Sequence, residues 1–275
     1  MKKFLLILTF FGLCSAGVFA QKKPAYSLFK AVPKDSLREM ETDRPDVTET
    51  PQTVDAGHFQ VETDLFRFQR QGKETGKTDE YFFNQANLKL GLTGSTAIQV
   101  TLESYVLQKE FDGAGNMEQQ HGFGDITLRI KQNLIGNNDG KFAIALLPYL
   151  KFPTSRADDE SQYEGGIIIP MQVKFNKQWT LGFQVEADRL QDEEGMGHHN
   201  EILQTVALSN HLSKKLEAIV ETYYTYEFKE KHMKNFLNAA LQYEIAKDML
   251  LDGGVNYGLQ HEAKKSYFVG LSFRL

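Results

Sequence analysis

Apolar and polar residues alternate with a period of two from residue 58 onward, over segment after segment. Around residue 100, for example, Ile98, Val100 and Leu102 share one face, whereas Gln99 and Glu103 share the other. This period predicts β-strands that carry one apolar face and one polar face. No stretch beyond the first twenty residues is long and apolar enough to suggest a transmembrane helix.

The alternation predicts twelve strands, and their length is unusual for a soluble domain. They cover residues 58–68, 80–92, 97–108, 123–135, 141–152, 163–175, 179–190, 200–212, 216–228, 234–244, 249–259 and 266–275. Strands of globular proteins average about 5 or 6 residues, whereas a tilted strand that crosses a bilayer needs about 9 to 11. The predicted lengths therefore favour strands that span a membrane.

The connections between these strands alternate in length. Short turns lie at 94–95, 136–140, 176–178, 213–215 and 246–248. The polar links between them are mostly longer, at 69–79, 109–122, 153–162 and 191–199, with shorter ones near 229 and 261. An even strand count with short turns at one end and long loops at the other is typical of bacterial outer-membrane barrels.

Aromatic residues gather in two bands about one strand length apart. The band at the short-turn end contains Phe142, Phe175, Trp179, Tyr243 and Phe273. The band at the long-loop end contains Phe82, Phe152, Tyr163, Tyr224, Tyr226, Phe228, Tyr257 and Tyr267. Such bands are typical of the aromatic girdles at the two membrane interfaces. Phe66 and Phe68 break the alternation, which indicates either a bulge or a misplaced strand boundary.

The main alternative is a soluble β-sandwich or lipocalin-like barrel, in which the apolar face would point inward. Periodicity alone does not distinguish inside from outside. The opposite face decides, because charged residues on strand after strand suit a wet or salt-bridged lumen. We therefore predict an all-β fold: a twelve-stranded antiparallel transmembrane β-barrel of the outer-membrane type over residues 57–275, preceded by an irregular N-terminal segment.

Residues 1–20 have the pattern of a cleavable secretory signal. A basic start at Lys2 and Lys3 is followed by an apolar run at 4–11 and a cleavage site at 18–20. Cleavage would remove Cys14, the only cysteine, so no disulfide is expected in the mature chain. We expect an outer-membrane location, with outer-membrane lipids and the barrel-assembly machinery as partners. The formal charge of -5 argues against nucleic acid as a partner.

Four short stretches resemble a known family. They are TDRPDVTETP at 42–51, AGHFQVE at 56–62, GDITLRIK at 124–131 and LLPYLKFPT at 146–154. Together they resemble the phenol-degradation meta-pathway transporter family of outer-membrane barrels, over about residues 40–275. The resemblance implies a transporter or channel. Such barrels often end in an aromatic residue, whereas here Gly270, Phe273 and Leu275 keep the spacing of an assembly signal with a terminal leucine.

The polar strand faces would line the lumen with charges of both signs. The expected inward carboxylates are Glu62, Asp64, Glu103, Asp125, Glu186, Asp188, Glu217, Glu221, Glu244 and Asp252, and the expected inward bases are Lys89, Arg129, Lys131, Lys151, Lys174 and Arg274. These charges fit two compatible interpretations: they pair across strands for structural reasons, and they form a conduit whose acidic bias mildly favours cations. Inward apolar candidates are scattered: Tyr105, Leu107, Ile168, Tyr223 and Phe268. Because twelve strands lie between the filled eight-stranded barrel and the open porins of about sixteen, the lumen is expected to be narrow.

The segment at 21–56 contains four prolines and little strand periodicity. One hypothesis is that Asp43, Arg44 and Asp46 enter the barrel from the periplasmic end, where Arg44 pairs with lumen carboxylates. The segment would then act as a plug. The alternative is a disordered periplasmic leader.

The sequence predicts no catalytic, metal or cofactor site. The only tight catalytic-type cluster, at 209–211 (Ser-Asn-His), lacks the Gly-x-Ser-x-Gly elbow of lipid hydrolases. His198 and His199 follow an acidic loop, but adjacent strand residues point to opposite faces, so a shared metal ion is disfavoured. The acidic turn at 158–160 suits either a solvated surface or a divalent cation, and the solvated surface is favoured.

We therefore predict a non-enzymatic outer-membrane channel that passes small, unidentified solutes passively through a narrow charged lumen. The N-terminal segment or the long loops would gate it. The alternatives are a structural or surface-anchor barrel without transport and, less favoured, an outer-membrane lipid-modifying enzyme.

Overall fold

The structure, a computed structural model, describes residues 26–138, 140–156, 161–192 and 197–275. The predicted signal peptide and the acidic turn at 158–160 lie outside the described residues. Across the described ranges, the helical structure is limited to a short 3-10 turn, η1 (Lys34–Ser36). No helix there is long and apolar enough to cross a membrane.

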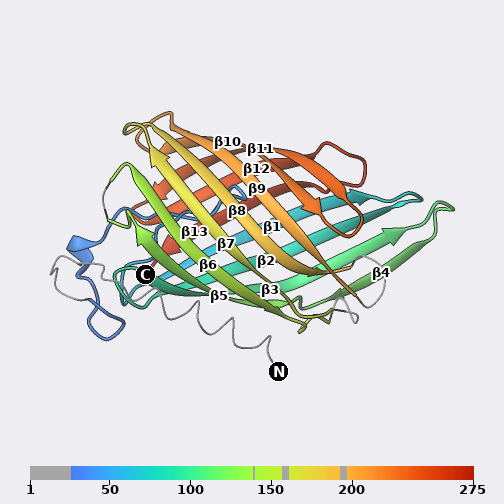
Figure 1. Cartoon of the computed structure of the whole chain (residues 1–275), viewed down its shortest axis with the longest axis horizontal. Coiled ribbons are helices and arrows are strands. Elements are labelled where there is room, and N and C mark those ends of the chain that lie inside the picture. Colours follow the sequence, from blue (N-terminus) through green and yellow to red (C-terminus); the bar gives the residue numbers. More distant parts are fainter. Residues whose placement is uncertain (1–25, 139, 157–160, 193–196) are drawn as a thin grey trace, which may run out of the picture.

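Thirteen β-strands make up the described part of the fold (Figure 1). They are β1 (Phe59–Gly72), β2 (Lys77–Gly91), β3 (Thr96–Phe111), β4 (Met117–Gly122), β5 (Ile126–Ile135), β6 (Phe142–Phe152), β7 (Glu164–Lys174), β8 (Trp179–Gln191), β9 (His198–His211), β10 (Leu216–Glu227), β11 (His232–Ala246), β12 (Met249–Gly258) and β13 (Lys265–Arg274). All paired neighbours are antiparallel, and β1 pairs with both β2 and β13. Twelve of these strands therefore close into a barrel, which confirms the predicted fold.

One strand, β4, lies outside the closed barrel. It pairs with the long-loop half of β3, from Val106 to Phe111, whereas β5 pairs with the short-turn half, from Thr96 to Leu102. Figure 1 shows this β3–β4 arm extending beyond the barrel at the right-hand end. The sequence predicted a loop at 109–122, because β4 is polar and exposed on both faces and shows no alternation.

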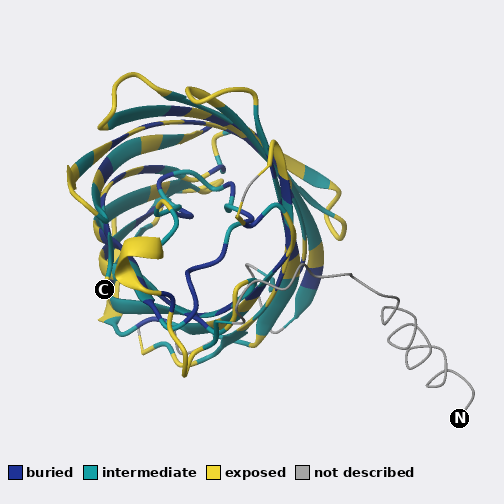
Figure 2. Cartoon of the chain, turned by 90° about the vertical axis from the view of Figure 1, so that its left-hand side faces the viewer, coloured by how far each residue is buried: buried dark blue, intermediate teal, exposed yellow. Residues whose placement is uncertain are grey.

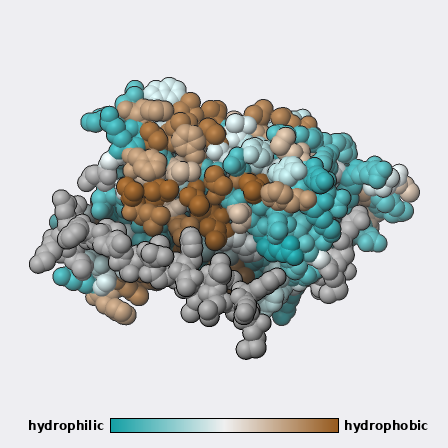
Figure 3. Space-filling view, viewed as in Figure 1, coloured by the Kyte–Doolittle hydropathy of each residue, from teal (hydrophilic) through white to brown (hydrophobic). Residues whose placement is uncertain are grey.

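The outer face of the barrel is apolar and the inner face is polar. Val220, Leu237 and Leu241 are each more than half exposed, whereas Gln60 and Gln99 are buried. Figure 3 shows hydrophobic residues gathered over the middle of the molecule and hydrophilic residues at its right-hand end. An apolar exterior around a polar interior is the reverse of a soluble barrel and suits a bilayer. The soluble alternative is therefore wrong.

The alternation of inward and outward residues shifts by one residue at neighbouring positions of β1, β2 and β3, which are referred to below as the bulge row. On β1, the register against β13 shifts between Asp64, which faces inward, and Phe66, which faces outward. The break at Phe66 is therefore a bulge. The same shift on β3 places Tyr105 on the outer face, where its ring lies 6.0 Å from that of Phe83. Tyr105 and Leu107 were predicted to face the lumen, and that prediction is wrong.

Residues 26–58 precede β1, and much of this stretch lies inside the barrel. Figure 2, a view into the left-hand end of Figure 1, shows a buried stretch of chain crossing the interior. Single β-bridges join Ser27 to Thr93 and Ala56 to Gly91, at the start and end of this stretch. Because the rest of it forms no regular ladder, its backbone groups need side-chain partners from the barrel wall. Residues 38–55 are referred to below as the lumen segment.

Candidate functional site: the occupied lumen

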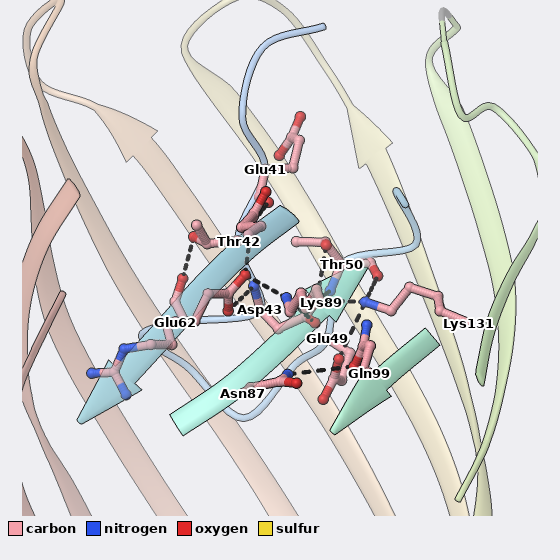
Figure 4. Close-up of polar contacts among 12 residues, drawn as sticks. Glu41, Thr42, Asp43, Glu49, Thr50, Glu62, Asn87, Lys89, Gln99 and Lys131 are labelled. Carbon is pink, nitrogen blue, oxygen red and sulfur yellow. Dashed lines mark hydrogen bonds and ion pairs between the residues drawn. The ribbon is translucent and has the colours of Figure 1, made fainter. Parts of the chain in front are cut away.

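A cluster of buried charges joins the lumen segment to β1, β2 and β5 (Figure 4). The carboxylate of Asp43 contacts Lys89 Nζ and lies 2.6 Å from Lys131 Nζ. Lys89 also contacts Glu62, and the second oxygen of Glu62 accepts the backbone N–H of Asp43 at 3.0 Å. All four residues are buried. Because an unpaired buried charge is costly, each of them depends on its partners.

Glu49 and Thr50 extend this cluster within the lumen segment. Glu49 contacts Arg129 and lies 3.2 Å from Lys131 Nζ, so it binds two bases of β5. The backbone N–H and the hydroxyl of Thr50 both donate to Asp43, at 3.0 and 2.9 Å. The lumen segment therefore folds back on itself between residues 43 and 50, and the wall holds the resulting loop.

Arg44 makes a second contact with the wall, between β1 and β12. Its guanidinium donates to Asp64 at 2.6 Å and to Asp252 at 2.5 and 3.1 Å. The ring of Phe268 lies 5.6 Å from the guanidinium carbon. A Cβ added at Gly270 would lie only 2.0 Å from Arg44 Nη2. Arg44 therefore reaches both carboxylates because residue 270 has no side chain.

A third contact uses Glu221 of β10, a wall carboxylate that binds the segment's backbone. Glu221 accepts the N–H groups of Val47 and Thr48 at 2.9 and 2.8 Å. It also accepts the Thr48 hydroxyl at 2.6 Å and the side-chain amide of Asn238 at 2.9 Å. Hydrogen bonds to an ionised acceptor are the stronger kind. This carboxylate therefore binds the lumen segment to β10, a part of the wall that is several strands away from β1 and β2.

The lumen segment is also anchored at the short-turn end of the barrel. Arg38 Nε donates to Asp55 at 2.7 Å, and Arg274 of β13 lies 3.3 Å from the same carboxylate. Lys174 of β7 lies 2.6 Å from Glu41. Both ends of the lumen segment are thus tied to strands that are far apart in the chain.

Two aspartates of the lumen segment have opposite environments. Burial alone would raise the pKa of Asp43, but Lys131 and Lys89 outweigh it and hold that pKa well below its ordinary value. Burial and the nearby carboxylate of Glu221 raise the pKa of Asp46 well above its ordinary value. No basic side chain of the described residues forms a salt bridge with Asp46. Asp43 is therefore stabilised as a carboxylate, whereas the charged form of Asp46 is disfavoured.

The charges predicted to line the lumen lie on the inner side of the wall or at its rim. Besides those already described, Lys151 lies 2.6 Å from Glu164 and 3.3 Å from Asp125 at the long-loop rim. Further contacts are Glu103 with Gln85, Glu186 with Gln184, and Asp188 with Tyr149, at 2.7 to 2.9 Å. Most of these side chains therefore have hydrogen-bond or ion-pair partners. Glu103, Glu186 and Asp188 have neutral partners, so their charges are not balanced by a paired base.

Several partners in the lumen were not predicted from the sequence. Arg38, Glu41, Glu49 and Asp55 lie in the lumen segment, where no alternation marks an inward side. Arg67 lies beyond the β1 bulge and donates to Asp64 at 2.7 Å. Only the excess of charge in a proline-containing stretch distinguished the first four, and only the break at residue 66 pointed to the fifth.

The inner wall also carries one aromatic patch. Tyr223 and Phe236, on β10 and β11, stack with their ring centroids 4.4 Å apart and their planes 6° from parallel. Val47 of the lumen segment packs against this pair. Phe268 lies 4.8 Å from the guanidinium carbon of Arg67. Tyr223 and Phe268 were predicted as scattered apolar residues of the lumen. Tyr223 lies in the patch that contacts Val47, and Phe268 lies beside the Arg44 and Arg67 guanidinium groups.

Two polar cavities remain beside the lumen segment. The first, of about 180 Å³, lies between the segment and the wall from β7 to β12, and its lining includes Asp46, Lys174, Glu217 and Glu244. The second, of about 140 Å³, lies beside Arg38 at the short-turn end. Each is large enough for several water molecules, so the segment narrows the lumen without filling it.

No metal-binding group accompanies these cavities in the described ranges. No group of three or more His, Cys, Asp or Glu side chains there is placed to hold a metal ion. His198 contacts the Tyr163 carbonyl, whereas His199 contacts Asp192, so the two adjacent rings serve different partners. His211 lies 3.8 Å from Glu217, and Asn210 donates to the Gln178 carbonyl.

Solved structures with a similar fold include barrels of the outer membrane. An outer-membrane channel from Pseudomonas putida F1 aligns with a TM-score of 0.61 at 10% identity, covering 86% of this chain and all of that one. The NanC porin aligns with a TM-score of 0.52 at 13% identity, covering 78% of this chain and all of the porin. At such identities the likeness shows the fold alone. No functionally curated protein matches the chain in sequence.

The family comparison is more specific. Residues 42–275 match the family described as "Putative MetA-pathway of phenol degradation". The match begins at the Asp43 and Arg44 contacts and continues through β13, so it spans the lumen segment and the whole barrel. The chain therefore belongs to this family, with the fold of an outer-membrane β-barrel.

Proposed function

We propose that the protein is a narrow outer-membrane channel that the lumen segment holds closed and that passes small solutes passively when the segment's ionic contacts open. One observation carries the proposal. Asp43 and Arg44, adjacent in the chain, form buried ion pairs with β2, β5, β1 and β12, while polar cavities lie alongside. Because these wall charges hold the lumen segment inside the barrel, the passage of solutes depends on the opening of these ion pairs.

The charge of the larger cavity favours cations as the solutes that pass most readily. Six carboxylates line it, at Glu39, Glu41, Asp46, Glu49, Glu217 and Glu244, against four bases at Arg44, Lys174, Lys214 and Lys215. An uncompensated acidic lining raises the local concentration of cations and lowers that of anions. We therefore expect a modest preference for potassium over chloride.

Single-channel recording in planar bilayers tests this function. Full-length protein with Asp43→Asn and Arg44→Gln loses the ionic contacts that these two residues make with the wall, and it should conduct more often or in larger steps than the unchanged protein. A potassium chloride gradient across the same bilayers should show the cation preference. The matched control, Lys34→Gln with Asp35→Asn, removes the same charges from the exposed η1 turn and should leave the recordings unchanged.

Folding of each variant is verified by the heat-dependent mobility shift that closed barrels show in SDS. If the folded double variant conducts like the unchanged protein, the lumen segment does not control passage. If no variant ever conducts, the protein is a structural barrel, which is the alternative function.

A further inference from the structure

The outer face of β13, β1, β2 and β3 carries a group of basic side chains at the long-loop end. Lys265 pairs with Arg70, Arg70 with Asp79, and Asp79 with Lys109 across consecutive strands. Paired residues share a face of the sheet. Tyr267 lies on the same face of β13 as Lys265, two residues closer to the membrane centre, and is 54% exposed, so this is the outer face. Lys77 lies two residues beyond Asp79 on the same face. Lys265, Arg70, Lys109 and Lys77 are referred to below as the basic row.

Each cation of the basic row lies over an aromatic ring of the same outer face. The charged atoms lie 4.7 to 5.5 Å from the ring centroids, in the pairs Lys265 with Tyr257, Arg70 with Phe68, Lys109 with Tyr81, and Lys77 with Phe111. Cations at this distance are attracted by the ring faces. The rings therefore hold the basic groups against the barrel wall, directly above the aromatic girdle.

The basic row lies at the height of a membrane interface. Lys265 is eight residues from Phe273 on β13. At about 3.3 Å per residue and a tilt of about 40°, this places it roughly 20 Å along the barrel axis from the short-turn girdle. The apolar band of outer-membrane barrels is about 25 Å tall, so Lys265 lies near the edge of this band on the long-loop side, where a lysine side chain extends its charge to the lipid headgroups.

The basic row keeps a net positive charge after its internal pairing. Asp79 is its one carboxylate, and Arg70 binds it through two hydrogen bonds of 2.6 and 2.8 Å, with Lys77 at 3.5 Å. No carboxylate of the described residues forms a salt bridge with Lys109 or Lys265. These two lysines, three strand spacings apart, are separated by about 14 Å. That span is too wide for one phosphate and suits two phosphates on linked sugars.

We propose that the basic row binds the two phosphate groups of a multiply acylated glycolipid of the lipid A type. The phosphates lie against Lys265 and Lys109, and the acyl chains lie along the aromatic side chains below them, at Phe66, Phe68, Tyr81 and Phe83. Cation and aromatic rows in this order match the order of phosphate and hydrocarbon in the lipid. The site is independent of the proposed conduction, because it lies on the opposite side of the wall from the lumen.

Native mass spectrometry of the full-length protein, purified in detergent and exchanged with defined lipids, tests this site. The probes are bisphosphorylated lipid A, the same lipid without phosphates, phosphatidylglycerol and inorganic phosphate. Lys109→Gln with Lys265→Gln should weaken lipid A binding about tenfold or more. Lys177→Gln with Lys247→Gln, in exposed turns at the short-turn end, removes the same charge and should leave binding unchanged.

The expected result is retention of bisphosphorylated lipid A by the unchanged protein and by the control, with loss in the row variant at an unchanged heat-dependent shift in SDS. Equal retention by the row variant would overturn the proposal. Equal binding of phosphate-free lipid A or of phosphatidylglycerol would also overturn it, since the row would then not select two phosphates on a glycolipid. Displacement of the lipid by millimolar inorganic phosphate would reassign the row to free phosphate.

Discussion

Gly270 illustrates how one residue serves the contact between the wall and the lumen segment. A side chain there would occupy the space of the Arg44 guanidinium, so even alanine would displace Arg44 from Asp252. Gly270 was predicted to form an assembly signal with Phe273 and Leu275, and that role stays a prediction. The structure adds a second reason for glycine at this position.

Asp43 and Asp46 should respond oppositely to the same substitution. Asp43→Asn leaves Lys89 and Lys131 without their shared carboxylate, so we expect it to lower the free energy of unfolding by about 3 to 5 kcal/mol. Asp46→Asn removes a charge that Glu221 repels, so we expect it to raise that free energy by about 1 kcal/mol. Urea unfolding in detergent micelles, followed by the SDS mobility shift, measures both.

The pH dependence of these two variants follows from the direction of each pKa shift. Asp43 has a lowered pKa in the folded state, so its contribution is present above its unfolded pKa and is lost as the pH falls through the folded value. Asp46 has a raised pKa, so its repulsion is present at high pH and disappears as the pH falls through that raised value. A gain from Asp46→Asn that persists at acidic pH would contradict this account.

At the residue scale, the sequence predicted the wall better than its partners. Lys131 and Lys89 could be assigned to the polar face because Ile130 and Leu88 alternate with them. Glu49 has no such neighbours, because the lumen segment is irregular. Its partner Arg129 is 80 residues away in the chain, and only the closed barrel brings the two together.

At the element scale, the strands were predictable wherever one face meets lipid and the other meets the lumen. The strand predictions failed where a strand extends beyond the barrel and where its inward and outward faces exchange. β4 extends beyond the barrel and is polar on both faces, so it was predicted as loop. The bulge row of β1, β2 and β3 reverses the faces within a strand, so the outward Tyr105 was assigned inward. In an alternating sequence, an inserted residue is visible only as a local break in the alternation, so the reversal of faces beyond it is easily missed.

Fluorescence quenching by brominated lipids tests the bulge row. In a Trp179→Phe background, which removes the only native tryptophan, Tyr105→Trp should be quenched strongly because this position faces lipid. Tyr223→Trp, on the inner wall, is the matched control and should be quenched weakly. The row is misplaced if the tryptophan at 105 escapes quenching while Leu241→Trp, on the exposed outer face, does not.

At the scale of the whole molecule, the barrel and its contents depend on each other. The wall supplies carboxylates and bases that would be costly in an empty apolar cavity, and the lumen segment supplies the partners of many of them. The wall in turn satisfies backbone groups that the irregular segment leaves unpaired, such as the N–H groups of Val47 and Thr48. The lumen segment inside and the closed barrel around it therefore stabilise each other.

Disulfide trapping in the outer membrane tests whether the lumen segment lies inside the closed barrel. The hydroxyl oxygens of Thr48 and Thr205 lie 2.5 Å apart, across the gap between the lumen segment and β9. In a Cys14→Ser background, Thr48→Cys with Thr205→Cys should form a disulfide under mild oxidation, seen as altered mobility in denaturing, non-reducing gels. Thr48→Cys with Val206→Cys should not, because Val206 is exposed on the lipid-facing side of the same strand. Absence of the first cross-link, or equal yield of both, would contradict the account.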